Sequence, residues 1–185
     1  MRVMGMCGSL RQGSYNRAVL QAAMELAPAG MEVRIWDRLG EVPHYDGGLD
    51  ADGVRPEAVE DLKRTLAEAD GLLIVSPEYN YSVPGGLKNA IDWASRPAGK
   101  SPFAGKPAAV AGASTGAIGT ARGQAHLREV LYACHARVMP HAGLLVGAAA
   151  QKITDGRLQD EQTRAFLAGF LEHFAAWIRV AGTRG

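Results

Sequence analysis

The chain has 185 residues, of which 47% are hydrophobic and 21% are charged, which suits a single globular domain over residues 1–185. With 20 basic and 19 acidic side chains its formal net charge is +1, so we expect neither nucleic acid nor an anionic membrane surface as a partner. Any anion that binds must therefore do so at a local site.

Apolar segments typical of strands alternate with segments of helical periodicity along the chain. The predicted strands are residues 2–7, 31–36, 71–75, 107–113 and 137–146, the last interrupted by Pro140. The predicted helices are residues 16–27, 54–69, 84–96, 121–133 and 161–180. Five strands alternating with five helices indicate an α/β fold with a parallel, doubly wound sheet.

Three loops follow three of the apolar strands, at residues 8–16, 77–83 and 114–119. In a doubly wound sheet the carboxyl ends of the strands share one edge, where such folds bind their ligands. We expect the three loops to converge there. Residues 37–53 show no period, and because loops of this length are usually functional, we expect them near the same site.

The first loop carries Ser9, Arg11, Ser14 and Asn16 and opens a helix, whose free amides and dipole favour an anion. The fork-shaped cation of Arg11 suits phosphate oxygens. The same residues also suit an N-capped helix with a solvated arginine. The spacing of the glycines matches neither the dinucleotide fingerprint nor the Walker loop.

The second loop is polar and aromatic and leads into a helix for which Pro84 suits the first position. Tyr79 and Tyr81 offer flat apolar surface, and the amides of residues 78–80 offer hydrogen bonds, so the loop suits a flat heterocycle with polar edges. The third loop is small and flexible. It is either an ordinary strand-to-helix turn or a place where a ligand approaches the backbone closely.

Three motifs stand in order along the chain, namely GSLR at residues 8–11 followed by Gly13, Ser14 and Asn16, PEYNYSVP at residues 77–84 followed by LKNAIDW at residues 87–93, and SxGxxG at residues 114–119. Together they resemble the NADPH-dependent FMN reductase family, whose members include flavodoxin-like quinone, azo-dye and chromate reductases. The resemblance implies a flavodoxin-like, five-stranded parallel sheet of strand order 2-1-3-4-5. Thr120 departs from the family, since many relatives carry glycine or alanine there.

The resemblance implies FMN as cofactor and NADPH or NADH as co-substrate. The residues that it assigns to FMN are Ser9, Arg11, Ser14, Tyr15 and Asn16 at the phosphate, Pro77, Glu78, Tyr79 and Asn80 at the flavin ring, and Ser114, Thr115 and Gly116 near the pyrimidine edge or ribityl chain. The nicotinamide would give hydride to the flavin, and a quinone, azo compound, chromate or free flavin would then take its place in a ping-pong reaction. We assign no catalytic acid or base.

The resemblance also implies a homodimer or homotetramer, built in part by the helix of Arg122 and Arg128, although a solvated basic face would explain these arginines equally well. Arg11, Arg38 and Arg122 are the candidates for the 2′-phosphate that distinguishes NADPH from NADH. His44 is a candidate for the border of the acceptor pocket.

Two other functions fit the same fold. A flavodoxin-type electron carrier would exchange electrons with proteins, but such carriers tend to be strongly acidic, unlike this chain. The second alternative is a flavin-free binding or regulatory module that keeps only the fold.

The two cysteines, Cys7 and Cys134, lack paired spacing, and the sequence shows no signal-peptide pattern, so we expect a reducing cytoplasm. We interpret both cysteines as packing residues. The five histidines lack metal-ligand spacing, and no metal site is predicted.

Overall fold

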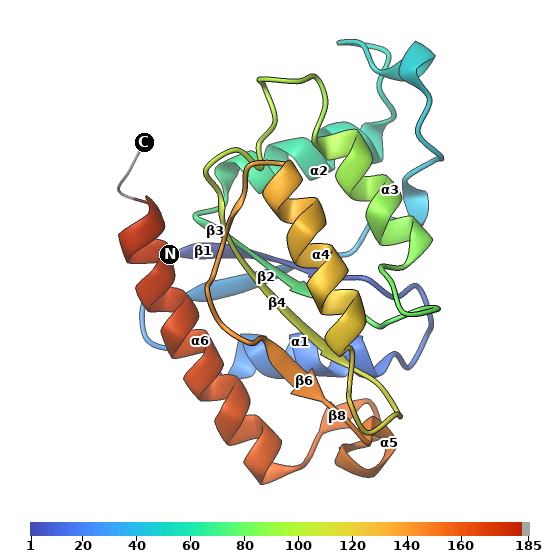
Figure 1. The fold of residues 1–185 in the computed structure, drawn as a ribbon. Coiled ribbons are helices and arrows are strands. Elements are labelled where there is room, and N and C mark those ends of the chain that lie inside the picture. The colour runs from blue at the N-terminus through green and yellow to red at the C-terminus, as the bar shows by residue number, and fades with distance from the viewer. Residues whose placement is uncertain (183–185) are drawn as a thin grey trace.

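A computed structural model describes residues 1–182 and places a parallel sheet at the centre of the molecule (Figure 1). Across the sheet the strand order is β2 (Glu32–Trp36), β1 (Arg2–Cys7), β3 (Gly71–Val75), β4 (Pro107–Ala113) and β5 (Arg137–Val138). A further strand, β6 (Leu144–Val146), pairs with the second half of β4, along the same edge as β5. The predicted strand order 2-1-3-4-5 is confirmed.

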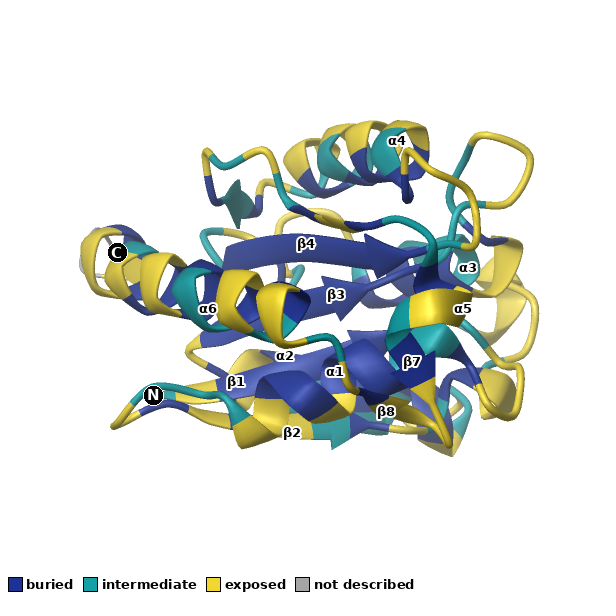
Figure 2. Cartoon of the chain, turned by 90° about the horizontal axis from the view of Figure 1, so that it is seen from below, coloured by how far each residue is buried: buried dark blue, intermediate teal, exposed yellow. Residues whose placement is uncertain are grey.

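Two layers of helices cover the sheet, and the central strands β1, β3 and β4 between them are almost wholly buried (Figure 2). The helices α1 (Tyr15–Glu25) and α6 (Glu161–Gly182) pack on one face, and α2 (Glu57–Glu68), α3 (Gly85–Ala94) and α4 (Ala121–Ala133) pack on the other. Leu73 faces the first layer and Leu72 the second, which explains why the central strands are continuous apolar runs. Within residues 1–182 no helix is long and apolar enough to cross a membrane.

Three prolines set element boundaries that differ from the predicted ones. Pro140 divides the predicted strand at residues 137–146 into β5 and β6, because proline has no amide hydrogen for the ladder. The helix predicted from Val54 begins only at Glu57, after Pro56, because the residue before a proline is disfavoured in helical conformation. Pro84 caps α3 rather than occupying its first turn.

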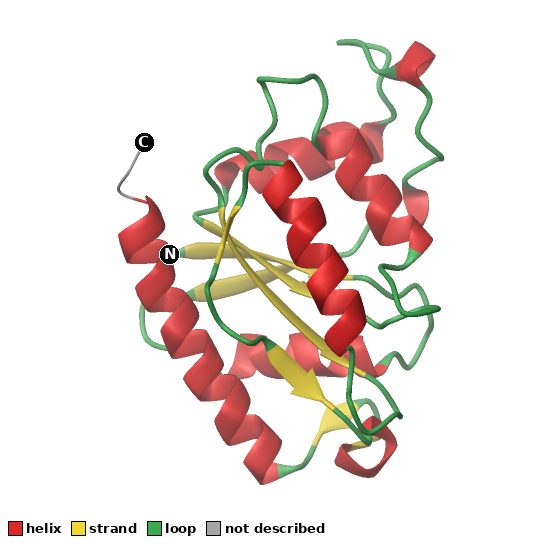
Figure 3. Ribbon diagram, viewed as in Figure 1, coloured by secondary structure: helices red, strands yellow, loops and turns green. Residues whose placement is uncertain are grey.

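The segment between β6 and α6 contains elements that periodicity did not predict (Figure 3). These are the one-turn helix α5 (Ala149–Lys152) and a hairpin of β7 (Ile153–Thr154) and β8 (Arg157–Leu158). Two-residue strands and a four-residue helix are too short to produce a recognisable period. The hairpin packs against α1 and extends the layer that α1 and α6 form on this face of the sheet.

Candidate functional site

The structure brings the three predicted loops to one edge of the sheet. Each loop departs directly from the ladder, since Gly8 N donates to Val75 O (2.9 Å), Ser76 N to Ala111 O (2.9 Å) and Ser114 N to Val146 O (3.0 Å). The chain moves outward in opposite directions from β1 and β3, so this edge contains the topological switch point where open α/β sheets bind ligands.

Gly8 permits the close approach of the first two loops. A Cβ atom at this position would lie 2.4 Å from Ser76 Oγ and 2.9 Å from Ser76 Cβ, so any larger residue would push the loops apart. The exposed part of the first loop is residues 10–13, with Gly13 in the left-handed region at φ +66°.

Arg11 folds back over the first loop. Its Nη2 donates to Gly13 O (3.2 Å), its guanidinium lies 5.1 Å from the centre of the Tyr15 ring, and its backbone N–H donates to Ser9 Oγ (3.3 Å). The guanidinium stays exposed, with donors free for an anion. Ser9, Arg11 and Tyr15 therefore form one cluster at the opening of α1.

Ser14 and Asn16 are buried beneath this cluster. Ser14 is the N-cap of α1, and its Oγ accepts a hydrogen bond from Arg17 N (3.4 Å). Asn16 is 3% exposed and bonds twice to the backbone of Ala113, with Nδ2 donating to the carbonyl and Oδ1 accepting from the amide. Its side chain thus joins the first loop to the third. Sequence reasoning assigned Asn16 to the phosphate and missed this structural bond, because the partner lies 97 residues away.

The second loop ends in a tight turn that projects two aromatic rings. Tyr79 and Ser82 exchange two backbone hydrogen bonds of 3.0 and 2.9 Å, and Asn80 (φ 49°) and Tyr81 (φ 65°) both have left-handed backbone, as a type I′ turn requires. Asparagine tolerates this conformation, whereas in tyrosine it costs about 1 to 3 kcal/mol. Tyr79 is 50% and Tyr81 65% exposed, so the turn holds aromatic surface in solvent.

The first turn of α4 fixes this loop. The Glu78 carboxylate accepts a hydrogen bond from Gly123 N (2.9 Å), and Ser82 Oγ lies 3.1 Å from His126 Nδ1. The guanidinium of Arg122 stacks 4.3 Å from the centre of the Tyr81 ring and lies 3.9 Å from Glu78 Oε1. The side chain of Glu78 therefore holds the loop on α4.

Arg128, one helical turn and a half further along α4, has a different role from Arg122. It is half-buried and donates to the carbonyls of His141 (2.8 Å) and Gln124 (3.4 Å). Burial lowers the pKa of its guanidinium. Arg128 is thus tied to the segment before β6, and it does not contribute to a solvated basic face.

The third loop combines an exposed tip with a buried base. Thr115 and Gly116 are exposed, and Ser114 Oγ accepts a hydrogen bond from Gly116 N (3.1 Å). At the base, Thr120 is fully buried, and its Oγ1 accepts from Gln124 Nε2 (2.9 Å). The same oxygen lies against Gly112, where a Cβ atom would be only 2.1 Å away. The side chain of Thr120, at the position where the sequence departs from the family, therefore fills the space that the missing side chain of Gly112 leaves.

The beginning of the long loop at residues 37–53 borders the first loop. Asp37 pairs with Arg17, and Asp37, Leu39 and Gly40 face the first loop across a cavity of about 440 Å³. Beyond this point Pro43 O accepts hydrogen bonds from Asn89 Nδ2 and Trp93 Nε1 (both 2.8 Å). The backbone at Pro43 is therefore fastened to α3, the helix that follows the second loop, and the expectation that the rest of this segment lies near the site stays a prediction.

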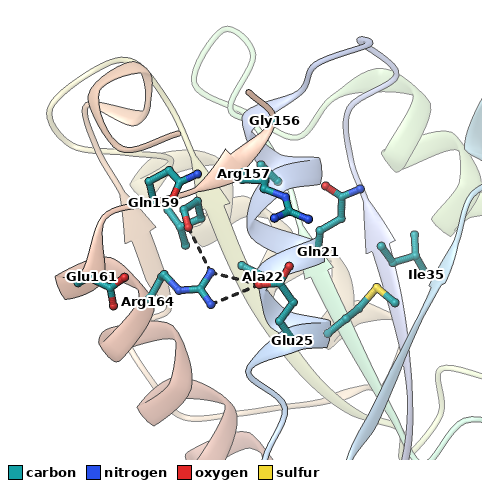
Figure 4. Close-up of a pocket in the computed structure, with 12 residues that line it drawn as sticks. Gln21, Ala22, Glu25, Ile35, Gly156, Arg157, Gln159, Glu161 and Arg164 are labelled. Carbon is teal, nitrogen blue, oxygen red and sulfur yellow. Dashed lines mark hydrogen bonds and ion pairs between the residues drawn. The ribbon is translucent and has the colours of Figure 1, made fainter. Parts of the chain in front are cut away.

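A cavity of about 700 Å³ lies away from the three loops, between α1, β8 and the first turn of α6 (Figure 4). Arg164 crosses it, pairing with Glu25 (3.2 Å) and donating to Leu158 O (3.2 Å). None of residues 8–16, 77–83 and 114–119 lines it, so it is separate from the site at the switch point.

The thiols fit the packing interpretation. Burial raises the pKa of both Cys7 and Cys134, so each is a neutral thiol at neutral pH and a poor nucleophile. Within residues 1–182 no group of three or more His, Cys, Asp or Glu side chains is arranged to hold a metal ion.

Comparison with known proteins agrees with the geometry. Residues 1–151 match the protein family described as NADPH-dependent FMN reductase. The chain belongs to this family. Family membership confirms the resemblance drawn from the loop motifs, and it makes the protein an oxidoreductase with FMN as its cofactor and NAD(P)H as its co-substrate.

Similar proteins match over almost the full length. An NAD(P)H-dependent FMN reductase of Pseudomonas aeruginosa is 44% identical over 180 residues, covering 97% of this chain and 96% of that protein. A quinone reductase of Escherichia coli K12 is 41% identical over 181 residues, covering 97% and 96%. The structure of a flavoenzyme NAD(P)H:(acceptor) oxidoreductase of Paracoccus denitrificans superposes with a TM-score of 0.86 at 40% identity, covering 97% and 98%. The fold of the present chain is therefore flavodoxin-like.

Proposed function

We propose that this protein is an FMN-dependent NAD(P)H oxidoreductase that passes electrons to quinones. The observation that carries the proposal is the convergence of three exposed loops at the switch point, in a chain of this family. A relative at 41% identity is named a quinone reductase, which supports quinones as the acceptor class. Azo compounds, chromate and free flavin are further proposed electron acceptors.

The loops fit FMN by the chemistry of their donors. The proposed phosphate site is the first loop, where Arg11 keeps exposed guanidinium donors beside the hydroxyl of Ser9 and the ring of Tyr15. Ser14 and Asn16 hold this loop from below, and one Nδ2 hydrogen of Asn16 remains for the phosphate. Neutral donors around one arginine suit a phosphate ester.

The flavin ring is proposed to lie against residues 77–80, with residues 114–116 at its pyrimidine edge or ribityl chain. When bound, FMN accepts hydride from the nicotinamide and passes electrons to the acceptor. The chain supplies position and polarity, since the turn at Tyr79 is fixed on α4 through Glu78 and cannot reorient freely. Backbone amides held in this way stabilise negative charge that develops beside them. We assign no side chain the role of acid or base.

An open edge has one place for both substrates. Residues 79–81 and 115–118 are exposed, and the proposal is that the oxidised nicotinamide leaves before the acceptor binds at the same surface. This order gives ping-pong kinetics.

A flavin on an open edge also gains from a second protein wall, which supports a homodimer or a homotetramer. We place this assembly in the cytoplasm, with small molecules as its electron acceptors. Light scattering of the purified protein tests the assembly, and a monomer would contradict it.

The deciding experiment follows NADPH and NADH oxidation by FMN-loaded protein with benzoquinone, varying both substrates. Parallel reciprocal plots, and bleaching of the flavin by nicotinamide without oxygen, are expected. Bound flavin that neither nucleotide bleaches would indicate a flavodoxin-type carrier, although the formal charge of +1 gives little electrostatic steering toward a charged partner. A protein that binds no flavin would be a module that keeps only the fold.

A further inference from the structure

The cavity between α1, β8 and the first turn of α6 has no part in the proposed function (Figure 4). Its volume of about 700 Å³ lies within the range of pockets that hold small molecules. The floor is apolar, because Ala18 and Ala22, one helical turn apart on α1, are 2% and 3% exposed and lie beside Ile35 of β2 and Leu158 of β8. Two alanines on the floor leave room for the apolar body of a ligand.

A tight hairpin places Arg157 beside this floor. The turn between β7 and β8 is Asp155–Gly156, whose φ angles of 50° and 74° are those of a type I′ turn, and Arg157 follows it directly. Figure 4 shows the Arg157 side chain directed from β8 toward α1. Within residues 1–182 its guanidinium has neither a hydrogen bond nor an ion pair. All five of its N–H donors are therefore available to a ligand.

Arg164 reaches the same pocket from α6, whose first turn is fixed by a hydrogen bond from Thr163 N to Asp160 Oδ1 (2.8 Å). Its Nη1 donates to Leu158 O (3.2 Å), and Nη1 and Nη2 share one oxygen of Glu25 at 3.2 and 3.3 Å. Charge-assisted hydrogen bonds are ordinarily about 2.7 to 2.9 Å long, so this ion pair is loose. The Glu25 side chain is 51% exposed, and such a pair contributes about 1 kcal/mol or less, so a ligand carboxylate can replace Glu25 at little cost.

The charges around the pocket favour a ligand with a single negative charge. The two arginines face two carboxylates, Glu25 and Glu161, so the lining has no net charge. Glu161 lies in the first turn of α6, where the helix dipole stabilises it. A ligand with several negative charges would be repelled by both glutamates, whereas one carboxylate is balanced by Arg157, which has no partner of its own among the described residues.

We propose that this pocket binds a small monocarboxylate with an apolar body of about the size of benzoate. Arg157 binds the carboxylate, with Arg164 as a second donor, and the apolar body lies on the alanines of α1. None of residues 8–16, 77–83 and 114–119 lines the pocket, so the site is separate from the edge proposed for the flavin. The proposal is independent of the proposed function, because it requires neither flavin nor nicotinamide.

The test is an NMR titration of the ¹⁵N-labelled, FMN-loaded protein with benzoate. The backbone amides of Gly156, Arg157 and Gln159 should shift as the pocket fills, and their shifts give the Kd. Benzamide has the same ring without the charge, and acetate has the charge without the ring. Each should bind this segment roughly tenfold or more weakly than benzoate, because each lacks one of the two contacts.

Arg157→Ala should weaken benzoate binding roughly ten- to a hundredfold, because a hydrogen bond between charged groups is lost. Arg157→Lys should recover part of the affinity, since it keeps the charge without the fork. Arg34→Ala is the matched control, because Arg34 is also an exposed arginine of a strand but does not line the pocket, and its benzoate affinity should equal that of wild type. Without benzoate, Arg157→Ala should oxidise NADPH at the rate of wild type.

Benzoate affinity that is the same in Arg157→Ala and wild type would overturn the proposal. Benzamide or acetate that binds as tightly as benzoate would do so too, because the charge or the apolar floor would then have no part in recognition. Shifts at the three loops alone would place benzoate at the flavin edge instead. The absence of any shift at residues 156–159 up to about 10 mM benzoate, tenfold above a millimolar Kd, would likewise refute the site.

Discussion

Asn16 and Ala113 are joined by two buried hydrogen bonds, from Asn16 Nδ2 to the Ala113 carbonyl (3.0 Å) and from the Ala113 amide to Asn16 Oδ1 (2.8 Å). One side chain thus completes the backbone bonding at the end of β4 and fixes the start of α1 beside it. The consequence is mechanical, because the loop proposed for the FMN phosphate cannot move away from the loop proposed for the pyrimidine edge.

Asn16→Ala should therefore destabilise the fold strongly. It leaves the buried amide and carbonyl of Ala113 without partners, which costs about 2 to 4 kcal/mol of unfolding free energy. Urea denaturation measures this loss. Asn89→Ala is the matched control, because Asn89 also bonds twice to backbone, at Pro43 and Tyr45, but through solvent-exposed hydrogen bonds that water can replace. A loss no greater than that of Asn89→Ala would contradict a structural role for Asn16.

Arg11→Ala should weaken FMN binding by about 1 to 3 kcal/mol, the range for a hydrogen bond to a charged group. Fluorescence titration of the apoprotein with FMN measures the affinity, and rising salt should narrow the difference from wild type. Arg34→Ala, which removes an exposed arginine from β2 that does not line the cavity beside the first loop, should leave FMN affinity unchanged. FMN affinity that is the same in Arg11→Ala and wild type would remove Arg11 from the phosphate site.

Gly112 and Thr120 should behave as a coupled pair. Gly112→Ala places a methyl group 2.1 Å from Thr120 Oγ1 and 2.3 Å from Ser76 O, and such overpacking costs about 1 to 3 kcal/mol. Thr120→Gly removes the first clash, so the double variant should be more stable than the two single losses predict, while the contact with Ser76 keeps it below wild type. Thermal unfolding of all four proteins measures the coupling, and strictly additive losses would contradict it.

Much of this architecture could be predicted from the sequence. Continuous apolar runs such as β3 predicted strands buried on both faces, and the order of strands and helices predicted the parallel sheet and the shared edge of its loops. These features depend on local periodicity, which a single sequence contains. The resemblance of the loop motifs to a family then supplied the strand order and the cofactor.

What could not be predicted depends on contacts between distant residues. The Asn16–Ala113 bonds and the Gly112–Thr120 contact leave no periodic pattern, and Asn16 alone resembles any residue of a capped helix start. The path of the long loop was hidden for the same reason, because the backbone of Pro43 is held by Asn89 and Trp93 on α3. Residues that a sequence assigns to a ligand can thus have a structural bond as well.

Stability should fall on mild acidification because of His141. Its Nδ1 accepts a hydrogen bond from Gly143 N (3.1 Å), and its ring lies 5.5 Å from that of His173. Burial, followed by the charges of His173 and Arg128, lowers the pKa of His141 below its usual 6.5. The folded protein then binds fewer protons than the unfolded chain, so its stabilisation is complete above pH 6.5 and is lost as pH falls toward the folded pKa.

Urea denaturation between pH 7.5 and pH 5 measures this loss, because this range extends about one unit or more on each side of the ordinary histidine pKa. His141→Asn keeps an acceptor for Gly143 N but removes the titrating ring, so its unfolding free energy should depend less on pH than that of wild type. His44→Asn, at an exposed position, should keep the pH dependence of wild type. Parallel curves for wild type and His141→Asn would show that protonation of His141 is not coupled to folding, and that the Gly143 bond contributes equally at both ends of the range.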